Sequence, residues 1–136
     1  MHIPKEFEKR FRNLMDSSEY SDFLTALNGS PVTGLRVNRL KVSLSRWNEI
    51  APFGNEPVPW SEDGFYLDGG SRPGAHPYYH AGLYYIQEPS AMFPAETLGA
   101  GPGDRVLDLC AAPGGKTVRL AEGMKNQGFL LSNDIN

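Results

Sequence analysis

The sequence predicts a mixed α/β protein, in which an α+β N-terminal module precedes the opening strand–helix–strand unit of a Rossmann-like domain. Two near-continuous apolar runs, at 105–110 and 129–133, flank one helical stretch, which is typical of parallel strands covered on both faces. The residues before them mix helical stripes with short alternating segments, separated by glycine and proline. Two strands and one helix do not complete a doubly wound sheet, so we expect the second domain to be truncated.

The start of the chain predicts two helices. A helix over 4–15 follows from a proline in the first turn and from apolar side chains at helical spacing. A second helix over 18–27 has Ser17 or Ser18 as its expected N-cap, and a following Asn-Gly pair ends it.

The middle of the chain predicts short strands around one short helix. Residues 34–42 follow a proline and alternate between apolar and polar side chains, which indicates a strand. Residues 43–51 predict a short helix that turns Trp47 inward. The segments 57–60 and 64–67 are then expected to pair as two short strands across a tight connection.

A loop rich in glycine and proline follows at residues 68–80. We expect the module boundary here, with 1–75 as the N-terminal module and 76–136 as the start of the second domain. His76 and His80 lie in this loop four residues apart, but a proline between them argues against a helix that would align them for a metal. No cysteine or carboxylate stands at ligand spacing, so no metal site is predicted.

The second module predicts an extended segment at 84–87 and then a helix that ends at Gly99 and Gly101. An apolar strand, a helix over 115–124 and a second apolar strand complete the chain. Because both strands are apolar and would have few neighbours, we expect self-association or poor solubility.

Composition narrows the class of protein. The chain has 136 residues and a net charge of −3, so it lacks the overall basic excess typical of many nucleic-acid-binding proteins. Its one cysteine excludes an internal disulfide. The N-terminus lacks the apolar core of a signal peptide, and no apolar run approaches the roughly 18 residues of a membrane span. We therefore expect a cytoplasmic protein.

The stretch "LDLCAAPGGKT", residues 107–117, is close to a phosphate-binding loop but departs from it in two ways. That motif needs a glycine five residues before Gly115, and Cys110 occupies the position. Pro113 also removes a backbone N–H from the loop. A nucleotide triphosphatase is therefore disfavoured, and the missing Gly-x-Gly-x-x-Gly pattern argues equally against NAD or FAD.

A different ligand suits the same turn. Ala111, Ala112, Gly114 and Gly115 have little or no side chain, so a ligand can approach the backbone at the carboxyl end of the first strand. Asp134 ends the second strand, nineteen residues after Gly115, where a carboxylate typically accepts hydrogen bonds from ribose hydroxyls. The pattern indicates an adenosine without a polyphosphate.

The string "VLDLCAAPGGKT" resembles the S-adenosylmethionine-binding motif of the Sun family of RNA cytosine-C5 methyltransferases, in particular its bacterial ribosomal RNA methyltransferase F-like branch. The segments "GLRVNRLK", "PVPW" with "GFY", "PGAHPYYHAGLYYIQEPSAM" and "SND" resemble that family in the same order, from about residue 7 to residue 134. The resemblance implies S-adenosyl-L-methionine as cofactor, ribosomal or transfer RNA as substrate, and an RNA-contacting N-terminal module.

The resemblance also assigns residues. The cofactor turn falls on Cys110, Ala111, Ala112, Pro113, Gly114, Gly115 and Lys116. The ribose-binding acid falls on Asp134, and the RNA-contacting stretch holds Arg36, Asn38 and Arg39. A solvated strand face is the alternative for Arg36 and Arg39.

Cytosine-C5 methylation needs an accessible thiolate that adds to C6 of a single-stranded or flipped base. Cys110 ends an apolar strand inside the cofactor turn, so we interpret it as a small wall residue rather than the nucleophile. The resembled family takes its cysteines from later Pro-Cys and Thr-Cys motifs, which this chain lacks. The chain is thus expected to be the N-terminal part of such an enzyme and inactive alone, or alternatively a non-catalytic RNA-binding module.

Overall fold

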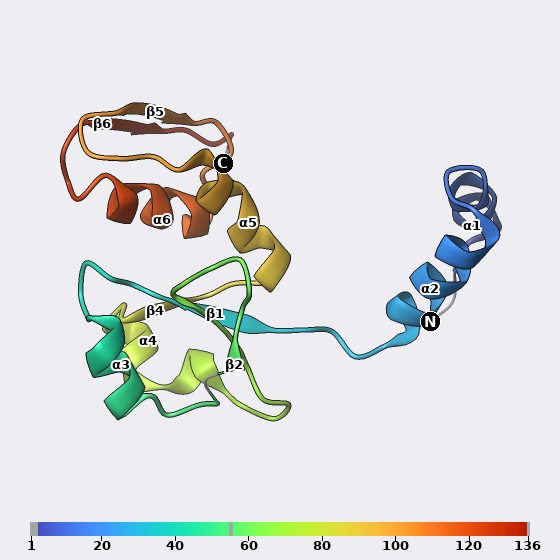
Figure 1. The fold of residues 1–136 in the computed structure, drawn as a ribbon, viewed down its shortest axis with the longest axis horizontal. Coiled ribbons are helices and arrows are strands. Elements are labelled where there is room, and N and C mark those ends of the chain that lie inside the picture. The colour runs from blue at the N-terminus through green and yellow to red at the C-terminus, as the bar shows by residue number, and fades with distance from the viewer. Residues whose placement is uncertain (1–2, 55, 136) are drawn as a thin grey trace. The chain divides into compact units, whose positions relative to one another are not determined.

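The computed structural model describes residues 3–54 and 56–135. Two compact units make up the chain, one ending at Pro31 and one beginning at Val32. The first unit is a pair of helices, α1 (Lys5–Arg12) and α2 (Ser17–Asn28), as the sequence predicts (Figure 1).

The cap of α2 differs from the prediction. Asp16, and not Ser17 or Ser18, is the N-cap: its Oδ1 accepts hydrogen bonds from the backbone N–H groups of Ser18 at 2.8 Å and Glu19 at 2.9 Å. The Glu19 side chain accepts in return from the Asp16 backbone N–H at 3.2 Å, which completes a capping box. The reciprocal bond explains why the aspartate is preferred over the neighbouring serines as the cap.

Aromatic stacking joins the two helices of the first unit. The ring centroids of Phe7 and Phe11 on α1 lie 4.3 Å apart, and Phe11 stacks on Phe23 of α2 at 4.9 Å. These rings are the apolar stripes that the helical spacing predicts.

A four-stranded antiparallel sheet opens the second unit. Its strands are β1 (Gly34–Val37), β2 (Glu56–Pro57), β3 (Gly64–Tyr66) and β4 (Tyr84–Ile86), in the order β2-β3-β1-β4. The predicted hairpin of the second and third strands is confirmed. The core on one face of the sheet consists of Leu35, Val37, Val42, Trp47, Phe65 and Tyr84.

The first strand is shorter than predicted. It ends at Val37 because Asn38 forms a turn, with its Oδ1 accepting from the backbone N–H of Leu40 at 3.1 Å. Helix α3 (Leu44–Ile50) follows, and its Trp47 side chain is fully buried, as predicted.

The antiparallel sheet extends past the predicted module boundary at residue 75. β4 lies beyond residue 75, yet it pairs with β1 through Leu35↔Ile86, Arg36↔Tyr85 and Val37↔Tyr84. A boundary after residue 75 would therefore cut through the sheet, and the module defined by the sheet extends to Ile86.

The loop 68–80 contains more helix than expected. A 3₁₀ turn, η1 (Pro73–Ala75), precedes the short helix α4 (Pro77–His80). Pro77 occupies the first helical position, where its missing N–H is tolerated, and the His76 side chain caps α4 by accepting from the Tyr78 backbone N–H at 3.2 Å. Among the described residues, no group of three or more histidine, cysteine or acidic side chains is placed to hold a metal ion.

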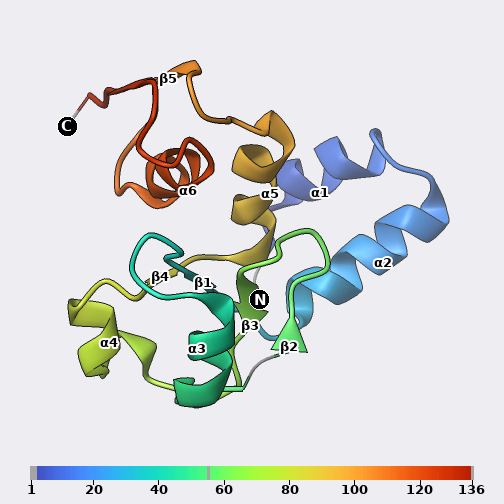
Figure 2. The same cartoon turned by 60° about the vertical axis from the view of Figure 1, so that its left-hand side comes forward.

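The C-terminal part has the predicted strand–helix–strand order. After α5 (Pro89–Leu98) come β5 (Arg105–Asp108), α6 (Gly115–Gly123) and β6 (Phe129–Ser132). β5 and β6 pair in parallel, as expected. Figures 1 and 2 show α5 and α6 packed together beside these two strands.

The two parallel strands have few neighbours, as expected from the sequence. Leu107, Leu109, Phe129 and Leu131 are all more than half exposed, so the described residues cover the strands incompletely. No helix in the described part of the chain has the length and apolar character needed to cross a membrane.

Candidate functional site

Asp108, the last residue of β5, forms side-chain hydrogen bonds at both ends of the turn between β5 and α6. Its Oδ1 accepts from the backbone N–H of Cys110 at 3.2 Å, and its Oδ2 accepts from the Thr117 hydroxyl at 2.6 Å. The turn is thus anchored at its first residues and at the first turn of the following helix. The sequence interpretation missed Asp108 and Thr117, although an acid at a strand end before a small-residue turn is a signal for such an anchor.

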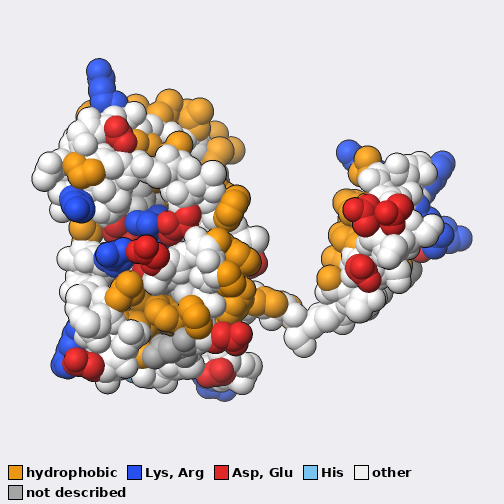
Figure 3. Space-filling view, in the orientation of Figure 1, with side chains coloured by type: hydrophobic (Ala, Val, Ile, Leu, Met, Phe, Trp, Pro, Cys, Tyr) orange, Lys and Arg blue, Asp and Glu red, His pale blue; other side chains and the backbone are white. Residues whose placement is uncertain are grey.

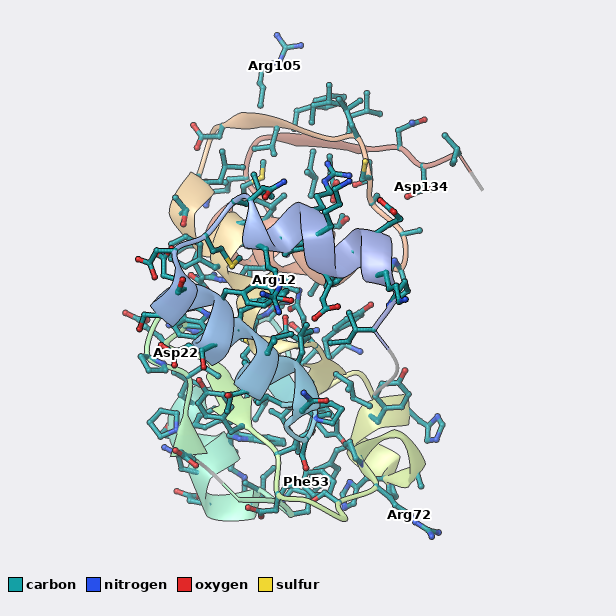
Figure 4. The ribbon with its side chains drawn as sticks, turned by 90° about the vertical axis from the view of Figure 1, so that its right-hand side faces the viewer. Arg12, Asp22, Phe53, Arg72, Arg105 and Asp134 are labelled. Atoms are coloured by element: carbon teal, nitrogen blue, oxygen red, sulfur yellow. The ribbon has the colours of Figure 1, made fainter. Side chains whose placement is uncertain are left out.

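Backbone bonds beyond the two strands bring Asp134 to this turn. The Asn133 N–H donates to the Asp108 carbonyl at 2.8 Å, and the Ala111 N–H donates to the Asn133 carbonyl at 3.1 Å. The Asp134 carboxylate then accepts from the Ala112 N–H at 2.9 Å. Figure 4 shows Asp134 near the C-terminal end of the chain, just beyond β6. The structure therefore places the predicted ribose acid and the predicted turn side by side.

A cavity of about 210 Å³ opens against the turn. One wall is the turn itself, from Cys110 to Pro113 with Gly115 and Lys116, and the other is residues 85–88 at the end of β4 with Ala91. This volume is below the roughly 300 Å³ of a typical ligand pocket. The cavity is therefore too small to hold a whole ligand of that class by itself. The predicted turn residues line it except Gly114, and Asp134 lies outside its lining.

Glycine is required where the turn enters α6. Gly114 has a φ of 107°, in the left-handed region that favours glycine. A Cβ on Gly115 would lie 2.8 Å from Cε1 of Tyr85 and 3.1 Å from Nε2 of Gln87, so the helix start rests directly on the β4 side of the cavity. The N-cap of α6 is Gly114, which has no side chain to accept hydrogen bonds from the first N–H groups of the helix.

The three residues predicted to contact RNA have three different environments. Arg36 is 1% exposed, so it is not available to an RNA phosphate, and this part of the prediction is wrong. Its strand face is not solvated either, because α6 covers it. Asn38 is half-buried and donates from its amide to the Gly82 carbonyl at 3.1 Å. Arg39 alone of the three is exposed, and it pairs with Glu62 at 3.2 Å.

Five charged side chains form a cluster between the antiparallel sheet and the helices α5 and α6. They are Arg36, Asp63, Glu96, Arg119 and Glu122. Arg119 of α6 donates from Nε at 2.7 Å and Nη2 at 2.6 Å to Glu96 of α5, a bidentate pair. Arg36 lies 3.8 Å from Glu122, and both side chains are almost completely buried.

Burial shifts the ionisation of this cluster. It raises the pKa of Glu122 to about 7, against the opposing effect of the Arg36 charge. Burial also raises the pKa of Asp63 and lowers that of Arg36. A second cavity, of about 420 Å³, borders the cluster and is lined by Arg39, Leu40, Arg119, Glu122, Gly123 and Lys125. Figure 3 shows acidic and basic side chains gathered in the hollow there.

Comparison with known protein families covers most of the chain. Residues 3–89 match the family model for the N-terminal domain of 16S rRNA methyltransferase RsmF. Residues 95–136 match the model for 16S rRNA methyltransferase RsmB/F.

Curated relatives agree with these matches. Ribosomal RNA small subunit methyltransferase F of Citrobacter koseri is 38% identical over 99% of this chain, which spans 30% of that protein. The same enzyme of Pectobacterium atrosepticum is 37% identical over 97% of this chain, which spans 29% of it. The chain thus spans about a third of the length of these relatives.

Solved structures share the fold. A methyltransferase homologue from Pyrococcus horikoshii is 31% identical, with a TM-score of 0.71 over 96% of this chain and 48% of its own. NSun6 from Pyrococcus horikoshii, solved with SFG, has a TM-score of 0.79 at 17% identity, over 95% of this chain and 58% of its own. The second likeness concerns the fold alone.

Proposed function

Since this chain belongs to the RsmF family of 16S rRNA methyltransferases, we propose that it is the N-terminal part of an S-adenosyl-L-methionine-dependent enzyme that methylates C5 of a cytosine in ribosomal RNA. The family membership confirms the resemblance seen in the sequence. The chain spans about a third of its relatives, so the activity is proposed for the protein of which this sequence is a part. Its substrate would place it in the cytoplasm.

The observation that carries the proposal is the meeting of the turn, the start of α6 at Gly114 and the Asp134 carboxylate. The small residues Ala111 and Ala112 let the cofactor approach the backbone closely. Asp134 accepts the Ala112 N–H at 2.9 Å and the Ile135 N–H at 2.7 Å, which fixes its carboxylate beside the turn where a ribose would lie. When bound, the cofactor supplies the methyl group on its sulfonium.

Fewer residues are proposed to contact RNA than the sequence indicates. Arg39 presents an exposed guanidinium group, and Lys125 is exposed on the same cavity. Side chains of this kind contact RNA phosphates without reading the base. Arg36 is excluded from this role by its burial.

A ligand titration tests the cofactor site. The ¹⁵N-labelled chain is titrated with S-adenosylhomocysteine, and amide shifts are expected at Ala111, Ala112 and Gly115. The cavity is smaller than a typical ligand pocket, so binding is expected to be weak. The variant Asp134→Asn should reduce the response.

The matched control is Asp104→Asn. Asp104 also accepts a backbone N–H, from Gly101 at 2.8 Å, but precedes β5 and so lies at the opposite end of the strand from the turn. Unchanged binding in the Asp104 variant and weaker binding in the Asp134 variant would support the site. Equal effects of both variants, or no response at the turn, would rule it out.

A non-catalytic RNA-binding module is the second candidate, favoured by the single cysteine of the chain. It predicts RNA affinity without any cofactor response. A filter-binding assay with ribosomal RNA fragments, with and without S-adenosylhomocysteine, separates the two proposals.

A further inference from the structure

Arg36 belongs to the antiparallel sheet but its side chain ends at the cofactor turn. It lies on β1, and its guanidinium Nη1 donates to the Gly115 carbonyl of α6 at 2.8 Å, across 79 residues of sequence. The same nitrogen lies 3.2 Å from Oε1 of Gln87, which lines the turn cavity. A buried strand residue therefore contacts the first residue of the helix that follows the turn.

The same guanidinium group also reaches the far end of α6. Its Nη2 lies 3.8 Å from Oε1 of Glu122. Gly115 and Glu122 are seven residues apart, or about two helical turns, and so lie on one face of α6. The planar fork of an arginine fixes both directions at once, which a lysine cannot do. Sliding or rotation of α6 on the sheet would break at least one contact.

The sheet register brings the supporting residues to the same place. Arg36 pairs with Tyr85 across β1 and β4. The Tyr85 ring and the Gln87 amide are the groups that a Cβ on Gly115 would meet. The position of the helix start is thus set by a close packing contact and by a charged hydrogen bond from adjacent strands.

We infer that Arg36 is a positioning residue for the cofactor turn, which holds the first turn of α6 against the antiparallel sheet. The antiparallel sheet then fixes the position in which the turn presents its backbone to the ligand. This inference rests on the proposed function for the role of the turn, but the contact it describes does not depend on a bound ligand.

The test removes the contact without leaving a buried charge alone. The double variant Arg36→Met/Glu122→Met replaces an ion pair with apolar side chains of similar size, a change that folded proteins often tolerate. The control Glu122→Gln removes the ion pair and keeps the Arg36 bond to Gly115. The readout is amide hydrogen exchange in the full chain at Ala111, Ala112 and Val118, whose N–H groups are bonded in and after the turn.

We expect these three amides to exchange about tenfold faster in the double variant, while Val37 and Gly64 in the sheet keep their rates. The control should keep the protection of the turn. Equal acceleration at the turn and in the sheet, or in both variants, would overturn the inference. If the double variant does not fold, Arg36→Lys is measured in the same way, with the same two outcomes.

Titration with S-adenosylhomocysteine separates the inference from the proposed function. If exchange at the turn is faster in the double variant but neither the parent nor any variant responds to the ligand, the positioning role stands and the cofactor site is rejected. Equal ligand response and equal protection in parent and double variant would reject the positioning role and keep the cofactor site. Local acceleration together with a several-fold weaker ligand response supports both.

Discussion

At the scale of single residues, Arg36 connects the antiparallel sheet to Gly115 and Glu122, which lie on one face of α6. The alternation along β1 correctly separates Leu35 and Val37 from Arg36. It contains no information on what covers the second face, because Gly115 and Glu122 are distant in sequence. The turn residues and Asp134 could be found because their spacing is local to one strand–helix–strand unit.

The buried carboxylate of Glu122 predicts a pH dependence. Burial raises its pKa to about 7 in the folded chain, above the ordinary value of 4.5. A raised folded pKa means that the stabilising contribution is complete below about 4.5 and is lost as the pH rises through about 7. The free energy of unfolding, measured with urea from pH 5 to pH 8, should therefore fall as the pH rises.

The variant Glu122→Gln isolates this group. Its unfolding free energy should fall less over the same range, while the contribution of Asp63 stays in both proteins. The charged groups that act on Glu122 are Arg36, Arg119 and Arg39, which oppose the rise in its pKa, and Asp63, which adds to it. Parallel pH profiles for the parent and the variant would contradict the prediction.

Gly115→Ala tests the close approach of α6 to β4. The added Cβ would lie 2.8 Å from Cε1 of Tyr85, so the helix start must shift. We expect a loss of about 1–3 kcal/mol in unfolding free energy from urea titration. Gly69→Ala is the control, because a Cβ there meets no atom within 4 Å. A loss no larger than that of the control would show that the contact is not tight.

At the scale of elements, the helices and the parallel strands could be predicted because their patterns are local. Their ends were less predictable, since side-chain bonds decide them: Asp16 starts α2 and Asn38 ends β1. The sheet extends past the predicted boundary at residue 75 because strand pairing joins segments far apart in the sequence. Nothing within residues 84–86 indicates that they pair with β1 rather than with the later strands.

The incompletely covered strands β5 and β6 predict self-association. Leu107 is 55% exposed and Leu131 is 51% exposed, in adjacent paired positions. Burying such a patch between chains is favourable by roughly 25 cal/mol per Å² of apolar area. The variant Leu107→Thr/Leu131→Thr should therefore shift the chain toward the monomer in sedimentation velocity.

The matched control for this shift is Leu40→Thr, which changes a leucine that is 46% exposed and lies outside the two strands. It should leave the sedimentation coefficient distribution unchanged. A parent chain that sediments as a monomer at all concentrations tested would contradict the prediction.

At the scale of the whole molecule, the fold and the site depend on each other. The antiparallel sheet, most of whose strands lie in the predicted RNA-contacting module 1–75, supplies Tyr85 to the cavity and Arg36 to the helix behind it. Truncating the sheet would therefore disturb the turn, although the turn sequence itself would be intact.

The chain alone is predicted not to methylate RNA. Cytosine-C5 transfer needs a thiolate that adds to C6 of the base, and the chain has one cysteine. Cys110 is exposed and lines the cavity at the turn, so we assign it to the wall of the proposed cofactor site. A labelled-methyl assay on ribosomal RNA fragments should give no product with the chain or with Cys110→Ser. Product from the parent that disappears in Cys110→Ser would instead make Cys110 the nucleophile and overturn its assignment as a wall of the turn.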